Sequence, residues 1–422
     1  MEEILIACHI LSIMKKTRLL LITHLFDPEP TFKGLVFARE LVNQGFDVEV
    51  LTGFPNYPGG VLYPGYKIQP FHKSQVDGIQ ITRVPLYPSH DQSALRRFFS
   101  YFSFALSAAI YGAFLAQRPD VIYAYHPPLT TGISALFIKL LRRAPIVYDI
   151  QDMWPDSLRA TGMLTNSFLL SIVSLFCRAT YSLVDHIVVL SPGFKRLLVA
   201  RNVPASKISV IFNWADENSL DVTHSDSALN LPGNHHFRIM FAGNIGKAQA
   251  LDTIIESAAI LQELGSNIIW ILLGCGIEMD RLKTEVVNRK LTNVVFLPSV
   301  PMGEVGFYLK SADALLVHLR KDPLFEITIP SKTQAYMTVG KPLLMAVDGD
   351  AADLVRQSGC GLVAESENPD ALVRAALQLA DMSPESLSLM GKRAQLYYSD
   401  HLSIVNGVTN FSAIFRSLCH SL

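Results

Sequence analysis

The chain has 422 residues, of which 50% are hydrophobic and 17% charged, and its formal net charge is −1. This length predicts two domains, and the balanced charge argues against a nucleic acid partner. The five cysteines are scattered without a C-x-x-C pair, which argues against a disulfide framework or metal cluster and for a reduced, cytoplasmic protein.

The first seventeen residues do not resemble a signal peptide. Glu2 and Glu3 stand where basic residues are expected, and two lysines follow the apolar run in place of a cleavage site. Because Met14 opens a segment typical of a natural start, we expect residues 1–17 to be an upstream extension or a short interfacial segment.

Residues 18–220 alternate between strand and helix patterns. Gly34 opens the first expected helix, and its missing side chain suits close approach of a ligand to the backbone. Its spacing does not fit a G-x-G-x-x-G loop. The crossovers imply a parallel sheet, whose strands we expect at residues 18–23, 47–52, 78–85, 120–125, 145–150, 186–191 and 208–212.

The segment from Phe98 to Gln117 is twenty residues long and carries no charge, so its length alone suits a membrane span. Serines, alanines and Gly112 lower its hydrophobicity, and a strand follows almost at once. These features favour a packed crossover helix with one face available to a bilayer. Nearby cations suit anionic headgroups, although a solvated surface is their commoner role; they are Arg96, Arg97, Lys139, Arg142 and Arg143.

Polar residues lie at the ends of two of these strands. His126 follows the strand at 120–125, at the edge where α/β sheets bind ligands, although a packing role suits its position equally. Asp149, Asp152 and Trp154 lie at the end of the next strand. They predict a polar cleft with an aromatic wall, with core packing and helix capping as the alternative.

A polar stretch at 217–236 resembles a linker, after which the alternation begins again. Strands are expected at 237–242, 268–273, 294–297, 314–317, 342–345 and 361–363. The sequence therefore predicts an α/β protein with two facing doubly wound, Rossmann-like domains and an inter-domain cleft. We place the N-terminal domain at residues 18–220 and the C-terminal domain at residues 236–396.

Two features of the second domain suit a diphosphate. The loop Gly243–Lys247 joins a strand to a helix, and Ser331 and Lys332 lie in the first turn of another helix. Amides at helix N-termini and lysine side chains stabilise charge on a diphosphate leaving group. Glu326 can accept hydrogen bonds from sugar hydroxyls, although ordinary capping chemistry explains this stretch comparably well. Since no D-x-D cluster stands in a matching position, we expect no metal cofactor.

Together these segments resemble bacterial family-four glycosyltransferases of the GT-B fold, especially L-fucosaminyltransferase-like members that build O-antigen, colanic acid or capsule. The resemblance covers Arg18 to about Ala376, in segments such as DVIYAYHPPLTTG, VYDIQDMWPDSL, FAGNIGKAQALDTIIESA and FEITIPSKTQAYMTVGKPLLM. It implies retaining transfer of a sugar, with N-acetyl-L-fucosamine as a candidate, from a UDP-sugar donor. The implied acceptor is a saccharide linked to polyprenyl diphosphate, at the inner leaflet of the inner membrane.

The resemblance also implies roles for individual residues. The positions around the reacting sugar and its diphosphate match His126, Lys247, Glu326 and Lys332, and those on the acceptor side match Asp149, Asp152 and Trp154. Further contacts to the donor are implied for Gly34, Gly243, Asn244, Gly246 and Ser331, and for the backbone from Leu297 to Val300, which would hold the base.

The sequence departs from the family at one motif. Counting back from Gly340, the two glutamates of the family's E-x7-E motif fall at Ile327 and Ala335. Glu326 is one residue from the first position, but the second has no carboxylate. This departure affects ribose recognition more than the chemistry, because internal return uses an oxygen of the donor's own diphosphate as the base.

Two other functions remain open from the sequence. One is a catalytically weak subunit that binds a sugar nucleotide, which the missing glutamate allows. The other is a UDP-sugar epimerase of the same fold, which requires an acid–base cluster. In the resembling family the last helix crosses back to the first domain, so we expect residues 397–422 to do so here.

Overall fold

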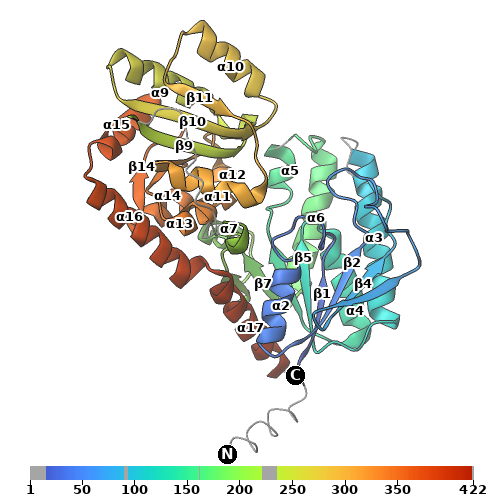
Figure 1. Cartoon of the computed structure of the whole chain (residues 1–422). Coiled ribbons are helices and arrows are strands. Elements are labelled where there is room, and N and C mark those ends of the chain that lie inside the picture. Colours follow the sequence, from blue (N-terminus) through green and yellow to red (C-terminus); the bar gives the residue numbers. More distant parts are fainter. Residues whose placement is uncertain (1–15, 90–93, 161, 221–234, 421–422) are drawn as a thin grey trace, which may run out of the picture. The chain divides into compact units, whose positions relative to one another are not determined.

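A computed structural model describes residues 16–89, 94–160, 162–220 and 235–420, and these form two compact units (Figure 1). Unit 1 contains the chain up to Leu190, residues Lys195–Ile211 and the chain from Val408 onward. Unit 2 contains Ser191–Phe194 and Phe212–Gly407. The predictions for residues 1–15 and for the linker between 221 and 234 lie outside the described residues.

Unit 1 is built on an eight-stranded sheet with the order β3-β4-β2-β1-β5-β6-β7-β8. Its central strands are buried except at Arg18, the first residue of β1, as expected for a parallel sheet covered on both faces. The strands are β1 (Arg18–Ile22), β2 (Asp47–Gly53), β3 (His72–Val76), β4 (Ile79–Val84), β5 (Val121–His126), β6 (Ile146–Ile150), β7 (His186–Val189) and β8 (Ile208–Val210).

The strand β3 was not predicted. It pairs antiparallel with β4, whereas the other pairs in this sheet are parallel. Its sequence HKSQV is mostly polar and exposed because it lies at the sheet edge, so it lacks the apolar run that marks a buried strand.

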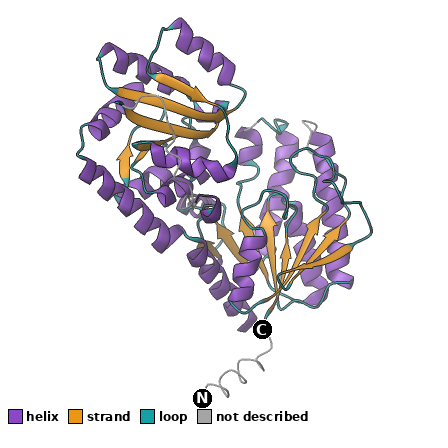
Figure 2. Cartoon of the chain, viewed as in Figure 1, coloured by secondary structure: helices purple, strands orange, loops and turns teal. Residues whose placement is uncertain are grey.

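Helices lie against both sheets (Figure 2). In unit 1, the long uncharged segment that begins at Phe98 lies mostly in helix α3, a crossover helix packed in the unit. No described helix is long and apolar enough to cross a bilayer. The helices between the strands of this unit are α2 (Leu35–Asn43), α3 (Ala94–Phe114), α4 (Thr130–Arg142), α5 (Asp156–Ala160), α6 (Ser167–Leu183) and α7 (Pro192–Ala200).

Unit 2 has a six-stranded, wholly parallel sheet with the order β11-β10-β9-β12-β13-β14. Alternate residues of each strand enter two separate cores, so Met240 packs on one face while Phe241 packs on the other. The strands are β9 (Phe237–Asn244), β10 (Ile268–Cys275), β11 (Val294–Leu297), β12 (Ala314–His318), β13 (Leu343–Ala346) and β14 (Gly361–Val363).

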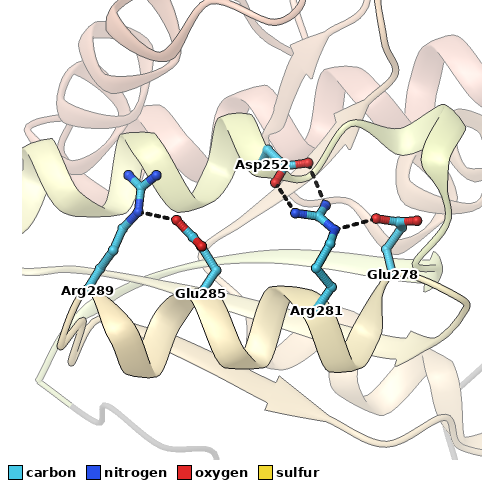
Figure 3. A network of polar contacts seen from close by, with 5 residues as sticks. All are labelled: Asp252, Glu278, Arg281, Glu285 and Arg289. Carbon is cyan, nitrogen blue, oxygen red and sulfur yellow. Dashed lines mark hydrogen bonds and ion pairs between the residues drawn. The ribbon is translucent and has the colours of Figure 1, made fainter.

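The helices of unit 2 cover both faces of this sheet, which makes it doubly wound. They are α8 (Glu217–Leu220), α9 (Asp252–Glu263), α10 (Met279–Asn288), α11 (Met302–Ser311), α12 (Pro323–Glu326), α13 (Ser331–Val339), α14 (Asp350–Ser358), α15 (Pro369–Ala380) and α16 (Pro384–Tyr397). An ion-pair network joins α10 to the start of α9: Arg281 contacts both Asp252 and Glu278, and Arg289 contacts Glu285 (Figure 3).

The final helix α17 (Ile404–His420) begins in unit 2, and its residues from Val408 onward belong to unit 1. Gly407 lets the helix approach Trp214, because a Cβ at this position would meet the indole ring. Further along, Phe411 packs against Phe37 and Tyr123 of unit 1, with ring centroids 5.4 and 5.6 Å away. The C-terminal residues therefore complete an aromatic cluster in the core of unit 1.

Candidate functional site

The candidate donor site lies where β9 ends in unit 2. The loop after Asn244 is pressed against β10, because Gly243 and Gly274 are paired neighbours in the parallel ladder. A Cβ on Gly274 would collide with the carbonyl oxygen of Gly243, and one on Gly276 with that of Ile245. The GCG sequence at the end of β10 therefore permits this close packing, and Gly243 has a φ of 132°, which favours glycine.

Helix α13 holds the same strand end from the other side. The ladder between β9 and β12 is paired only as far as Met240, so Ala242 has no backbone partner there. Instead, the Tyr336 hydroxyl accepts from the Ala242 N–H at 2.8 Å and donates to the Ala242 carbonyl at 3.1 Å. Tyr336, which sequence reasoning missed, thus fixes the backbone immediately before Gly243.

Lys332 lies in the first turn of α13, as predicted, and its amino group is buried. The Nζ atom lies 3.6 Å from the centroid of the Phe241 ring and has no hydrogen-bond partner among the described residues. It is also 3.4 Å from the point where a Cβ on Gly243 would stand. Burial lowers the pKa of this amino group to about 7. An unpaired buried amine beside a glycine loop is suited to an anionic ligand.

A second unpaired nitrogen comes from His318, the last residue of β12. Its Nδ1 donates to the carbonyl oxygen of Gln249 at 2.7 Å, so Nε2 carries the lone pair in the neutral ring. Nε2 is buried without a partner among the residues that the structure describes. Burial lowers the pKa of this imidazole, and the charge of Lys332 lowers it further. His318 is not among the site residues that the sequence predicted.

The rest of the loop is mixed in exposure: Asn244 and Lys247 are exposed, whereas Gly246 is buried. Lys247 begins a short 3-10 turn, Lys247–Gln249, and its side chain points to solvent. Gly246 donates its N–H to the Gln249 side chain at 3.2 Å, which closes the turn. The carbonyl of Ala248 accepts from the Arg320 N–H at 2.9 Å, so the loop is anchored to the end of β12.

Glu326 is the last residue of α12, and its side chain is exposed. Its carbonyl oxygen is covered by Gly349, which has a φ of 74° and where a Cβ would collide with it. Ala335 is half-buried and packs against one hydrophobic core of unit 2, so the residue at the second position of the E-x7-E motif contacts apolar side chains. Ser331 is exposed at the start of α13, and Leu297 and Val300 pack partly buried against the same core.

In unit 1, His126 ends β5 and is 1% exposed. Its ring lies edge-on to Trp154, with centroids 5.3 Å apart, and neither nitrogen has a hydrogen-bond partner among the described residues. Burial lowers the pKa of His126 to about 3, so the ring is neutral at physiological pH. The Trp154 indole N–H donates to Asp152 at 3.3 Å. The structure therefore brings together three of the predicted residues of this unit.

Asp149 lies apart from that group, fully buried inside β6. Its carboxylate accepts from the Tyr123 hydroxyl at 2.5 Å and from the Gln151 side chain at 2.6 Å. Burial raises its pKa, while the charge of the buried Lys33 opposes that rise. These hydrogen bonds hold the Asp149 carboxylate inside unit 1, and its role on the acceptor side stays a prediction.

Gly34 precedes α2, where the sequence predicted room for a ligand. The carboxylate of Asp27 occupies that room: its Oδ2 accepts from the Leu35 N–H at 2.6 Å, and a Cβ on Gly34 would collide with it. The glycine is thus explained by the approach of Asp27 to the helix N-terminus. Contact between Gly34 and a diphosphate stays a prediction.

No group of three or more metal-ligating side chains occurs among residues 16–89, 94–160, 162–220 and 235–420. The groups that the structure brings together in unit 2 are the Lys332 amine, the backbone at Gly243 and the His318 imidazole. Such a set neutralises and hydrogen-bonds an oxygen-rich anion.

Comparison with known proteins identifies the family of the two domains. A family model described as a glycosyl transferase 4-like domain matches residues 35–214, and one described as glycosyl transferases group 1 matches residues 228–397. The chain therefore belongs to the group 1 glycosyltransferases, whose two Rossmann-like domains form the GT-B fold. The prediction of two doubly wound domains is confirmed, and the cleft between them stays a prediction.

The names of two relatives refer to colanic acid and amylovoran biosynthesis. The putative colanic acid biosynthesis glycosyl transferase WcaI of Escherichia coli K12 is 26% identical over 372 residues, covering 84% of this chain and 89% of that protein. The amylovoran biosynthesis glycosyltransferase AmsK of Erwinia amylovora is 25% identical over 212 residues, covering 49% and 51%.

Solved structures share the fold at low identity. HepE of Anabaena, determined with UDP and glucose, has a TM-score of 0.66 and 14% identity, covering 95% of this chain and 100% of that one. An α,α-trehalose-phosphate synthase of Burkholderia vietnamiensis has a TM-score of 0.71 and 12% identity, covering 96% and 99%. These likenesses establish the architecture alone.

Proposed function

We propose that this glycosyltransferase moves a sugar from a UDP-sugar to a saccharide carried on polyprenyl diphosphate, with retention of anomeric configuration, in surface polysaccharide synthesis. The observation that carries the proposal is the buried, unpaired amino group of Lys332 beside Gly243. A diphosphate supplies negatively charged oxygens that can accept hydrogen bonds from this amine, which has no acceptor among the described residues.

The comparisons support the substrate classes. HepE was determined with UDP and with UDP-glucose, and the names of WcaI and AmsK place them in colanic acid and amylovoran synthesis. N-acetyl-L-fucosamine is the first sugar to test, because the resemblance of the IPSKTQAYM segment points to it. Since Ala335 offers no carboxylate, we assign ribose recognition to other groups of unit 2.

The chemistry follows from the residues of each unit. Lys332, Lys247 and the amides of the Gly243 loop balance the charge that grows on the diphosphate as the bond to the sugar breaks. The freed diphosphate oxygen accepts the proton of the acceptor hydroxyl, and that hydroxyl oxygen bonds to the anomeric carbon on the same face. Glu326 accepts hydrogen bonds from the sugar, and neutral His126 contacts the reacting sugar from unit 1. No metal ion takes part in this scheme.

The proposed place of action is the cytoplasmic side of the inner membrane, with the protein bound peripherally. A polyprenyl carrier is confined to the bilayer, so its enzyme gains rate by residing at that surface.

Transfer by the purified protein tests the proposal. A panel of UDP-sugars, beginning with UDP-N-acetyl-L-fucosamine, is supplied with lipid-diphosphate saccharides, and the anomeric configuration of the product is read by NMR. Lys332→Ala and Lys247→Ala are expected to lose most activity. Unchanged transfer in both variants contradicts the site, binding without transfer by the wild type favours the subunit role, and conversion of a UDP-sugar without an acceptor favours an epimerase.

A further inference from the structure

Three helices of unit 1 form one layer over its sheet. Helix α3 packs on α4, where Ser134 donates to the carbonyl of Ala105 at 2.9 Å and Gly112 makes room for Ile138. Helix α4 packs on α6 at Gly132, where a Cβ would stand 2.8 Å from Thr180. The side of this layer away from the sheet is called the outer face below.

The outer face is unusually apolar. On α3, Phe98, Phe102 and Phe114 are between 53% and 64% exposed, and on α4 Leu140 is 75% exposed. On α6, Phe168 and Leu175 are 72% and 67% exposed, and further aromatic and aliphatic side chains stand beside them. A soluble surface rarely gathers so many large apolar groups unless it meets a partner.

The charge of this layer is one-sided. The sequences of α3, α4 and α6 contain no aspartate or glutamate. Exposed arginines stand at the start of α3, directly after α4 and within α6, at Arg96, Arg143 and Arg178. Lys139 is engaged with Asp185 at 2.7 Å, so this nearby carboxylate is already neutralised. Lys139, one of the cations predicted to meet headgroups, is thus paired with a carboxylate of the protein itself.

We propose that the outer face of α3, α4 and α6 is a docking surface for an anionic lipid bilayer. The phenylalanines and leucines enter the boundary between headgroups and acyl chains, and the arginines meet lipid phosphates. Helix α3 has 21 residues, so when it lies flat on the membrane it covers about 32 Å. The inference rests on the proposed function for its purpose, because a lipid-carried acceptor is met at such a surface.

The charge pattern favours lipid over a second copy of this chain. Two copies meeting through this face would bring arginines against arginines with no acidic residue of these helices between them. An anionic bilayer offers an apolar interior and a negative surface together, which matches both properties of the face.

Sedimentation of the full-length protein with vesicles tests the surface. Vesicles of phosphatidylcholine alone are compared with vesicles of phosphatidylcholine and phosphatidylglycerol in equal parts. We expect binding to the anionic vesicles and at least a tenfold fall in the partition coefficient for a triple variant, Phe102→Ser, Leu140→Ser and Phe168→Ser. The matched control is Ile277→Ser, Val287→Ser and Leu389→Ser, which removes similarly exposed apolar groups from unit 2 and should bind as the wild type.

A second variant keeps the test independent of folding. Arg143→Gln with Arg178→Gln removes two exposed positive charges and keeps side chains of similar size, and it is expected to reduce the preference for anionic vesicles. Wild-type binding by both the triple and the arginine variant overturns the proposal. A wild type that ignores vesicles but forms dimers, which the triple variant dissolves, overturns it in favour of a second copy.

Transfer assays separate this inference from the proposed function. The triple variant should retain transfer to a water-soluble saccharide acceptor while losing transfer to a lipid-carried acceptor in vesicles. A wild type that glycosylates the soluble acceptor but does not bind vesicles refutes the surface and leaves the function standing. One that binds vesicles but transfers no sugar from any UDP-sugar refutes the function and leaves the surface standing.

Discussion

The amino group of Lys332 lies over the face of the Phe241 ring, 3.6 Å from its centroid. An ammonium group over an aromatic ring is attracted by the ring's π electrons, but this contact replaces few of the hydrogen bonds that water supplies. Burial therefore still lowers the pKa of Lys332 to about 7, so that the side chain is partly neutral near neutral pH.

This position predicts a pH-dependent affinity for UDP. A diphosphate binds the ammonium form, so affinity should fall as the pH rises through about 7, and binding should take up a proton. Calorimetry in buffers of different ionisation enthalpy measures both effects. Lys332→Met should bind UDP at least tenfold more weakly with little pH dependence in this range, while Lys310→Met, at an exposed site on α11, should match the wild type. If the affinity of Lys332→Met for UDP still falls as the pH rises through about 7, that result would falsify Lys332 as the group that causes the pH dependence.

The same group affects stability in a defined direction. Because the pKa of Lys332 is lower in the folded chain than its ordinary value of 10.5, the unfolded chain binds more protons between about pH 7 and that value. The free energy of unfolding should rise with pH across this window more steeply in the wild type than in Lys332→Met. Urea denaturation at several pH values checks this, and parallel curves contradict it.

Two substitutions at His318 distinguish its structural hydrogen bond to Gln249 from a contact between Nε2 and the donor. Asparagine can keep the hydrogen bond to the Gln249 carbonyl while removing Nε2, whereas phenylalanine removes both. We expect His318→Asn to retain its melting temperature and to raise the KM for the UDP-sugar several-fold. His318→Phe should lower both stability and activity. If His318→Asn has wild-type kinetics, Nε2 does not contact the donor.

Tyr336→Phe should weaken the strand end that carries Gly243. The variant leaves the N–H and carbonyl of Ala242 without the hydroxyl that now pairs with both, which costs about 1–3 kcal/mol for a buried group. Chemical denaturation measures the loss, and UDP affinity should fall with it. Unchanged stability would mean that water takes the place of the hydroxyl.

Asp149 and Asp152 should respond differently to the same substitution. Asp149→Asn removes a buried negative charge that opposes the charge of the buried Lys33, so we expect a loss of about 3–5 kcal/mol in the free energy of unfolding. Asp152→Asn, at a half-buried position beside Trp154, should leave the melting temperature nearly unchanged and raise the KM for the acceptor. Equal destabilisation of both variants argues against an acceptor role for Asp152.

Much of the fold could be predicted because its parallel strands are short apolar runs. The strand Ala314–His318 and the helix that begins at Ser331 were both located from local sequence, so Lys332 was placed correctly at a helix start. The edge strand β3 escaped because a polar strand with one neighbour carries no such signal.

The site was predicted less completely, because burial and pairing depend on residues distant in sequence. Asp149 lies at a strand end, but its carboxylate is buried, where it accepts a hydrogen bond from Tyr123 and interacts with the charge of Lys33. Gly34 was expected to let a ligand approach the backbone; the Asp27 side chain lies beside it in the structure, and contact with a ligand stays a prediction. His318 and Tyr336 gave no local signal, since each acts on a segment more than sixty residues away.

The position of Phe411 and Phe415 has a consequence for how the protein is made. Both rings pack with Tyr123 in the interior of unit 1, although they lie within the last twelve residues of the 422-residue chain. During translation, the earlier residues of unit 1 leave the ribosome long before this pair is synthesised, and domains otherwise tend to fold in order from the N-terminus. Because unit 2 stands between these two rings and the rest of unit 1 in the sequence, the aromatic core of unit 1 is completed only after unit 2 has been synthesised.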